Sequence, residues 1–140
     1  MQFIKVVLLI FVFNIYFVQS QSLKEYRWKN RIILLVYNEA NSESFQKQRE
    51  SFLEKADALK ERDLILIYLN NETVDFNHPD SDAIDGRQLR KQLRIRENFR
   101  GVLLIGKDGG VKLRAEYPVE PQQIFDLIDS MPMRRAEMKN

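Results

Sequence analysis

Residues 101–114 read GVLLIGKDGGVKLR, and their pattern gives the clearest structural signal in the sequence. The first five residues, 101–105, form a short apolar run that is typical of a buried strand. Residues 106–110 (GKDGG) follow, and their Asp-Gly and Gly-Gly pairs accept the positive φ angles of a tight turn. Residues 111–116 then predict a second strand that returns antiparallel to the first. The stretch therefore predicts a β-hairpin.

Two more apolar runs lie before the hairpin. Residues 31–37 (RIILLVY) and 64–69 (LILIYL) have the composition of strands that are buried on both faces. Between them, residues 43–60 carry apolar side chains at spacings of seven, four and three, which predicts one helix with an apolar stripe. A strand, a helix and a strand in this order require a parallel pair with a right-handed crossover.

The remaining segments complete the order of elements. Residues 70–85 are polar and turn-prone, which predicts a long connection. Asp85 is placed to cap a helix over residues 86–94, and residues 122–131 predict a last helix that Pro132 ends or kinks. The order β-α-β-α-β-β-α fits an α/β domain with one mixed four-stranded sheet and helices on both faces. This arrangement is the thioredoxin-like core.

The first 20 residues differ from the rest of the chain. Lys5 supplies a short positive region, residues 6–18 are almost unbroken in apolar side chains, and residues 18–20 (VQS) suit a signal-peptidase site. The apolar run is shorter than the ~20 residues that a bilayer-spanning helix needs. We therefore predict a signal peptide over 1–20, a single domain over 21–140 without a membrane span, and a periplasmic or extracellular location. An uncleaved anchor is the alternative interpretation.

The composition excludes several classes of chemistry. The chain has no Cys, so it forms no disulfide and performs no thiol redox or peroxidase reaction of its own. Its single His excludes a multi-histidine metal cluster within one chain. The 22 Lys and Arg against 20 Asp and Glu exclude a wholesale basic or acidic surface. We accordingly predict no metal and no cofactor.

Several long strings of the sequence resemble one domain family over residues 23–138. They are YRWKNRIILLVY, RDLILIYL, GVLLIGKDGGVKLR and FDLIDSMPMRRAEM. The chain resembles the prokaryotic branch of the DUDES domain family, a domain of unknown function. The same domain occurs in the vertebrate coiled-coil-domain-containing protein eighty and in sushi-repeat-containing secreted proteins. The resemblance implies a thioredoxin- or peroxiredoxin-like fold and an exported protein. It implies no established activity.

The end of the first strand is where a thioredoxin-like protein would carry its active site. Redox enzymes place a Cys there because a helix N-terminus favours the thiolate. This chain has Asn38, Asn41 and Ser42 in that region, and residues 99–101 (FRG) lack the proline expected before the third strand. One interpretation is that Asn41 and Ser42 only cap the next helix. The other is a thiol-independent enzyme that uses these polar groups to hold its substrate.

Charge is strongly polarised along the middle of the chain. Residues 61–85 hold seven acidic side chains and one basic, whereas residues 86–114 hold nine basic and two acidic. Helical spacing would place the cations at positions 87, 90, 91 and 94 in one stripe, and those at positions 96 and 100 follow it. The candidate binding residues are therefore Arg87, Arg90, Lys91, Arg94, Arg96 and Arg100.

Two interpretations of this basic segment stay open. It is either a solvated face that the preceding acidic residues partly neutralise, or a docking face for a polyanion such as an acidic glycan or an acidic protein surface. Nucleic acid is not predicted, because the chain is expected to be exported and no aromatic residue interleaves the cations. The sequence therefore favours a non-catalytic binding or accessory module.

Two smaller features complete the set of candidates. Residues 75–82 offer oxygen ligands, but their spacing does not match a calcium-binding loop, so we interpret them as an acidic surface loop. Arg134 and Arg135 follow the last predicted helix. We expect them to bind the final carbonyl groups of that helix, or alternatively to extend the basic surface.

Overall fold

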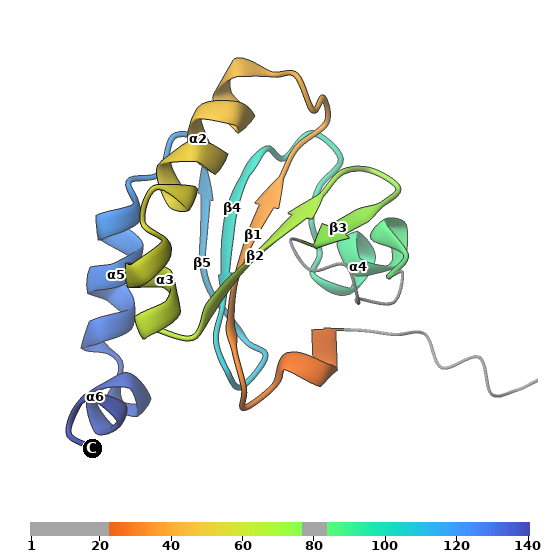
Figure 1. The fold of residues 1–140 in the computed structure, drawn as a ribbon. Coiled ribbons are helices and arrows are strands. Elements are labelled where there is room, and N and C mark those ends of the chain that lie inside the picture. The colour runs from red at the N-terminus through yellow and green to blue at the C-terminus, as the bar shows by residue number, and fades with distance from the viewer. Residues whose placement is uncertain (1–22, 77–83) are drawn as a thin grey trace, which may run out of the picture.

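The computed structural model describes residues 23–76 and 84–140, and a five-stranded mixed sheet forms its centre (Figure 1). Across the sheet the strands lie in the order β3-β2-β1-β4-β5. The first two strands in sequence are parallel, and every other neighbouring pair is antiparallel. The strands are β1 (Arg31–Val36), β2 (Leu64–Leu69), β3 (Val74–Phe76), β4 (Gly101–Ile105) and β5 (Val111–Glu116).

Helices cover both faces of the sheet. The helical segments are η2 (Leu23–Tyr26), α2 (Glu43–Leu53), α3 (Ala56–Glu61), α4 (Gly86–Gln92), α5 (Pro121–Ser130) and α6 (Pro132–Met138). Figure 1 shows α2, α3 and α5 on one side of the sheet and α4 on the other. Two apolar clusters result, because successive strand residues point to opposite faces. One joins Phe45, Phe52 and Phe125 to the sheet, and the other joins Leu89 and Phe99 to it.

The hairpin and the parallel crossover are confirmed. β4 and β5 pair antiparallel, and the turn between them is closed by hydrogen bonds from Gly106 N to Gly110 O (2.9 Å) and from Gly109 N to Gly106 O (3.0 Å). Gly109 has a φ of 84°, which a residue with a side chain rarely adopts. Gly101 is required for a different reason, because an added Cβ would lie 2.1 Å from the carbonyl oxygen of Ala115.

The predicted four-stranded sheet has a fifth strand. β3 lies inside the segment that was predicted as a loop, and it pairs antiparallel with the end of β2. Asn70 makes this hairpin, because its Oδ1 accepts hydrogen bonds from Glu72 N (2.8 Å) and Thr73 N (2.7 Å). The Asn70 side chain takes the place of a backbone turn in this way. The polar composition of the segment gave no sign that a strand follows.

The helices also differ from the prediction at three places. The helix predicted over 43–60 is two helices, α2 and α3, and Phe52 and Leu59 of the predicted stripe are both buried. α4 ends at Gln92 rather than at Arg94, which has a φ of 53°. Pro132 ends α5 as expected, but it also opens α6, where a missing N–H carries no cost.

Some predictions fall outside the residues that the structure describes. The segment predicted as a signal peptide and most of the acidic loop over 75–82 belong to this group. Within residues 23–76 and 84–140, no helix has the length and apolar character needed to cross a bilayer.

Candidate functional site

The end of the sheet at which β1 stops is the place where the predicted helix-end site would lie. Asn38 follows β1 by two residues, and its Oδ1 is buried without a hydrogen-bond partner among the described residues. Tyr117 closes the same end, since its hydroxyl donates to Val36 O at 2.8 Å. Burial raises the pKa of Tyr117 well above its usual range, and Tyr37 raises it further. This phenol therefore acts as a neutral hydrogen-bond donor.

The other two residues predicted for this site are placed differently. Ser42 occupies the cap position of α2 with φ −63° and ψ 132°, but its side chain makes no capping hydrogen bond. Asn41 is exposed. The predicted side-chain cap is therefore wrong, and the chain before α2 is instead held by the amide of Gln46, which donates to Ala40 O.

Aromatic rings fill the space beside the start of α2. The ring of Tyr37 stacks on Phe45 with centroids 4.2 Å apart, and Phe45 meets Tyr68 edge-on at 5.9 Å. The guanidinium of Arg49 lies 5.6 Å from the centre of the Tyr68 ring. The Tyr68 hydroxyl is buried, and no described residue hydrogen-bonds to it. Aromatic packing therefore fixes the start of α2 to the sheet, and the sequence has no Cys to supply a thiol there.

A groove of about 490 Å³ runs between α2 and the segment that follows β5. Gln48 fixes its walls, because the amide donates to Val119 O (2.7 Å) and accepts from Val119 N (2.7 Å). The lining carries both signs of charge, from Glu43, Lys47 and Glu120. Lys47 is paired with Glu43, so the lining holds no unpaired cation for an anionic ligand.

The basic segment keeps five of its six candidate side chains on the surface. They are Arg87, Lys91, Arg94, Arg96 and Arg100. None of the five forms an ion pair with a carboxylate in the described part of the chain. Asp85 caps α4 as predicted, by accepting from Arg87 N at 2.9 Å.

Arg90 does not belong to this exposed set. The prediction that Arg87, Arg90, Lys91 and Arg94 form one exposed stripe is therefore wrong. The helical spacing of Arg90 from Gly86, Leu89 and Leu93 places it on the inner face of α4, and it is only 7% exposed. Its Nε donates to Asn70 O (3.1 Å) and its Nη1 to Arg96 O (3.2 Å), while its Nη2 is buried without a partner among the described residues. Burial lowers the pKa of Arg90, which Glu97 partly opposes and Arg100 reinforces.

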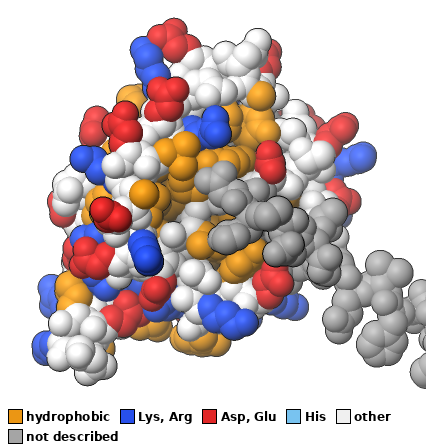
Figure 2. Space-filling model, viewed as in Figure 1, with side chains coloured by type: hydrophobic (Ala, Val, Ile, Leu, Met, Phe, Trp, Pro, Cys, Tyr) orange, Lys and Arg blue, Asp and Glu red, His pale blue; other side chains and the backbone are white. Residues whose placement is uncertain are grey.

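A second group of cations lies at the opposite end of the sheet, and carboxylates neutralise all of it. Arg31, 2% exposed, binds Glu137 at 3.1 Å, and Lys107 binds both Glu137 (2.7 Å) and Asp63 (2.8 Å). In the same cluster, Asp129 accepts from Arg62 (2.7 Å) and Arg134 (3.2 Å), and Arg134 also binds Glu61 (2.9 Å). Figure 2 shows the mixture of both signs over α3, α5 and α6.

These contacts lower the pKa values of Asp129 and Glu137. Hydrogen bonds from Arg62 hold the pKa of Asp129 below its usual range, against a smaller opposing effect of burial. Burial alone would raise the pKa of Glu137, but Arg31 and Lys107 together lower it.

The prediction for the residues after the last helix needs correcting in part. Arg134 is buried in this cluster, where it binds Asp129 and Glu61, so it neither caps α5 nor extends the basic surface. Arg135 is exposed. Ion pairs between residues so far apart in sequence leave no local signal, and reasoning from the sequence missed the cluster.

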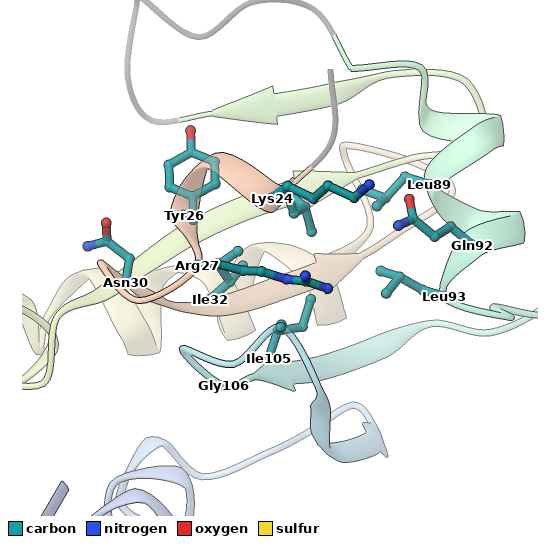
Figure 3. Close-up of a pocket in the computed structure, with 12 residues that line it drawn as sticks. Lys24, Tyr26, Arg27, Asn30, Ile32, Leu89, Gln92, Leu93, Ile105 and Gly106 are labelled. Atoms are coloured by element: carbon teal, nitrogen blue, oxygen red, sulfur yellow. The ribbon is translucent and has the colours of Figure 1, made fainter. Parts of the chain in front are cut away.

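A small cavity of about 40 Å³ lies between η2, α4 and the hairpin turn (Figure 3). Arg27 and Lys24 extend across it toward α4, while Tyr26 and Asn30 point away. Ile32, Leu89, Leu93 and Ile105 contribute apolar side chains to its lining. A space of this size holds little more than water. Among the described residues there is also no group of three His, Cys, Asp or Glu side chains that could hold a metal.

Solved structures with the same fold include peroxiredoxins. The reduced 2-Cys peroxiredoxin of Plasmodium vivax superposes with a TM-score of 0.60 and 15% identity, over 83% of this chain and 84% of that one. Thioredoxin peroxidase I of Plasmodium yoelii gives 0.58 and 17%, over 84% and 80%. At these identities the likeness shows the fold, and the thioredoxin-like prediction is confirmed with one additional strand.

Sequence comparison gives the family. "Coiled-coil domain-containing protein 80" of Danio rerio is 26% identical over 133 residues, which cover 83% of this chain and 15% of that protein. This chain thus spans a small part of the curated relative. The model of the "Domain of unknown function (DUF4174)" matches residues 22–137, nearly the whole chain. The protein is therefore a member of the DUF4174 family, in a thioredoxin-like fold.

Proposed function

We propose that this protein is an exported, non-catalytic binding module that holds an acidic glycan through the exposed part of its basic segment. One observation carries the proposal. Arg31, Arg62, Lys107 and Arg134 at one end of the sheet are each paired with carboxylates, whereas five cations that lie close together in the sequence are exposed without ion pairs to described residues: Arg87, Lys91, Arg94, Arg96 and Arg100. We call these five residues the basic face.

The physical basis is the repulsion between neighbouring like charges. Arg87 and Lys91 lie four residues apart in α4, and such a pair of cations destabilises a helix by a few tenths of a kcal/mol. A polyanion relieves this repulsion and brings several charges into place at once. Arg114 adds to the surface, because it donates to Leu93 O (2.8 Å) and Arg94 O (3.3 Å) and so stays beside the basic face. The absence of Cys from the sequence supports binding rather than thiol chemistry.

The test is a comparison of two variants that carry the same change in charge. In the first, Arg87, Lys91, Arg96 and Arg100 become Gln. Arg94 is kept because its φ of 53° makes it sensitive to substitution. The control variant places the same four changes in α3, α6 and their flanks, at Lys55, Lys60, Arg135 and Lys139, which are all exposed.

We expect the first variant to bind a sulfated polysaccharide at least tenfold more weakly than the wild type, by calorimetry at 0.15 M salt. The control variant should lose less than threefold, because charges beyond the Debye length of ~8 Å contribute little. Equal losses in both variants would show that only net charge matters. Binding to an acidic peptide but not to the polysaccharide would identify the partner as a protein instead.

A further inference from the structure

Trp28 is the most exposed large apolar side chain among the described residues, with 67% of its surface open to solvent. Its backbone has a φ of 64°, a left-handed conformation that is rare for a bulky side chain. Gly adopts this conformation without steric cost, yet the chain has Trp at this position. A single exposed apolar residue is ordinary on a protein surface. An exposed ring on a strained backbone is not, because native proteins keep such strain mainly at sites that bind or react.

The turn from η2 into β1 and the hairpin turn together hold this backbone in place. Trp28 N donates to Lys107 O at 2.8 Å, and Asn30 N donates to Tyr26 O at 2.9 Å. The indole packs in neither apolar cluster of the described residues. The fold therefore presents a large ring to solvent on a fixed section of backbone.

The small cavity of Figure 3 joins this corner of the molecule to the basic face. Arg27, which directly precedes Trp28, lies against the hairpin turn and extends across the cavity toward Leu93 of the α4 side. Leu93 directly precedes Arg94, a member of the basic face, and its carbonyl oxygen accepts from Arg114 at 2.8 Å. Arg27 therefore continues the cationic surface from the basic face to Trp28.

We propose that Trp28 stacks on a sugar ring of the acidic glycan that the basic face holds. This inference rests on the proposed function and adds recognition of the sugar to recognition of its charge. A pyranose ring presents C–H groups on its faces, and an indole offers a flat apolar surface with only two side-chain torsions to fix. The exposed cations on either side of it in the sequence, Arg27 and Lys29, receive sulfate or carboxylate groups of the same chain.

The fold in this way supplies an exposed ring that the basic segment itself lacks. Phe99 is the aromatic residue of that segment, and it is 6% exposed and packs in the core. Residues 27–29 read RWK, an aromatic side chain between two cations. Cations alone attract any polyanion, whereas cations beside an exposed ring favour ligands that carry both charge and flat rings.

The first experiment uses the fluorescence of the wild-type protein, because Trp28 is the single Trp of the chain. A sulfated oligosaccharide should shift the emission to shorter wavelength and protect the indole from acrylamide, a neutral quencher, along one saturating curve. Inorganic polyphosphate, which carries charge but no sugar ring, is the control and should leave acrylamide quenching unchanged. Unchanged quenching with the oligosaccharide, or equal protection by both polyanions, would overturn the proposal.

The second experiment removes the ring. Trp28→Gly should weaken oligosaccharide binding about tenfold by calorimetry, the order that a stacked aromatic ring contributes to the binding of a nucleic-acid base. The same variant should unfold at an equal or higher urea concentration, because Gly suits a φ of 64°. Trp28→Tyr, which keeps a ring, should recover most of the affinity.

The matched control is Leu53→Ala, which shortens a 38% exposed apolar side chain of α2, on the other side of the sheet from α4 (Figure 1). It should change the affinity less than about twofold, because scattered exposed apolar residues are ordinary surface. Equal losses in Trp28→Gly and Leu53→Ala would contradict the proposal. Loss of stability together with loss of binding in Trp28→Gly would show that the ring has a structural role instead.

Comparison with the basic-face variant separates this inference from the proposed function. If that variant loses the oligosaccharide while Trp28→Gly binds it as the wild type does, the basic face is correct and the role of Trp28 is wrong. If Trp28→Gly alone loses it, the Trp28 site is correct and the basic face is wrong. If neither variant affects binding, both proposals fail. A shift of the emission with phosphatidylglycerol vesicles but not with the oligosaccharide would identify a membrane surface as the partner and overturn the inference.

Discussion

Glu137→Gln is the substitution that tests the ion cluster most sharply. Glu137 accepts two hydrogen bonds from Arg31 (3.1 and 3.2 Å) and one from Lys107 (2.7 Å). Arg31 lies 2% exposed, so its charge has no access to water once the carboxylate is gone. Removing one partner of a fully buried pair costs ~3–5 kcal/mol.

The expected cost is smaller here, because Glu137 is 27% exposed and the amide keeps one oxygen that accepts from Arg31. We expect the free energy of unfolding to fall by about 2 kcal/mol, which corresponds to one charged hydrogen bond. The assay is urea unfolding followed by circular dichroism at pH 7. The far-UV spectrum of the folded variant should be unchanged, because the substitution alters side-chain contacts and removes no backbone hydrogen bond.

The matched control is Glu43→Gln. Glu43 pairs with Lys47 on the surface of α2, where the two side chains are 81% and 73% exposed. Such a pair contributes little, and we expect no measurable change in unfolding. Equal destabilisation by the two substitutions, or none by Glu137→Gln, would refute the conclusion that this cluster anchors the end of the sheet.

Three further predictions follow from the same contacts. The pKa of Glu137 is lowered in the folded state, so the stability that its carboxylate contributes is complete above the unfolded pKa of ~4.3 and is lost as the pH falls further. The difference in unfolding free energy between wild type and Glu137→Gln should therefore shrink below about pH 4, as measured by urea unfolding. Gln48→Leu leaves the buried N–H and C=O of Val119 unpaired and should cost about 2–4 kcal/mol by the same assay, and a change near zero would show that water replaces the amide. Gly101→Ala should prevent folding or lower the melting temperature severely, since its Cβ would lie 2.1 Å from a strand carbonyl oxygen, whereas Gly110→Ala, with its nearest contact at 3.3 Å, should be tolerated.

Much of the fold could be predicted because its decisive signals are local. Residues 64–69, 101–105 and 111–116 are the strands predicted from apolar runs and turn residues. β3 could not be found in this way, because its hairpin depends on the side chain of Asn70 rather than on an apolar pattern. α6 was missed because Pro132 indicates equally the end of one helix and the start of another.

The candidate site was predictable only in part, for a physical reason. Composition indicates that residues 86–100 are basic, but it does not predict which cations of the chain form ion pairs in the folded protein. Arg90 turns inward because it lies four residues after the buried Gly86 and three before Leu93, and this spacing was present in the sequence. The long-range pairs of Arg31 and Arg134 depend on the tertiary fold, and nothing near them in the sequence indicates their partners.

The salt dependence of glycan binding distinguishes binding through the basic face from binding elsewhere. The measurement is the slope of log K against log salt for a sulfated polysaccharide, from 0.05 to 0.3 M, for the wild type and for the variant with Gln at positions 87, 91, 96 and 100. Each cation that meets an anionic group adds to this slope, because it releases a condensed counterion. We predict a steep negative slope for the wild type and a clearly shallower one for the variant. Identical slopes would contradict the account, because the basic face would then not be the surface that binds.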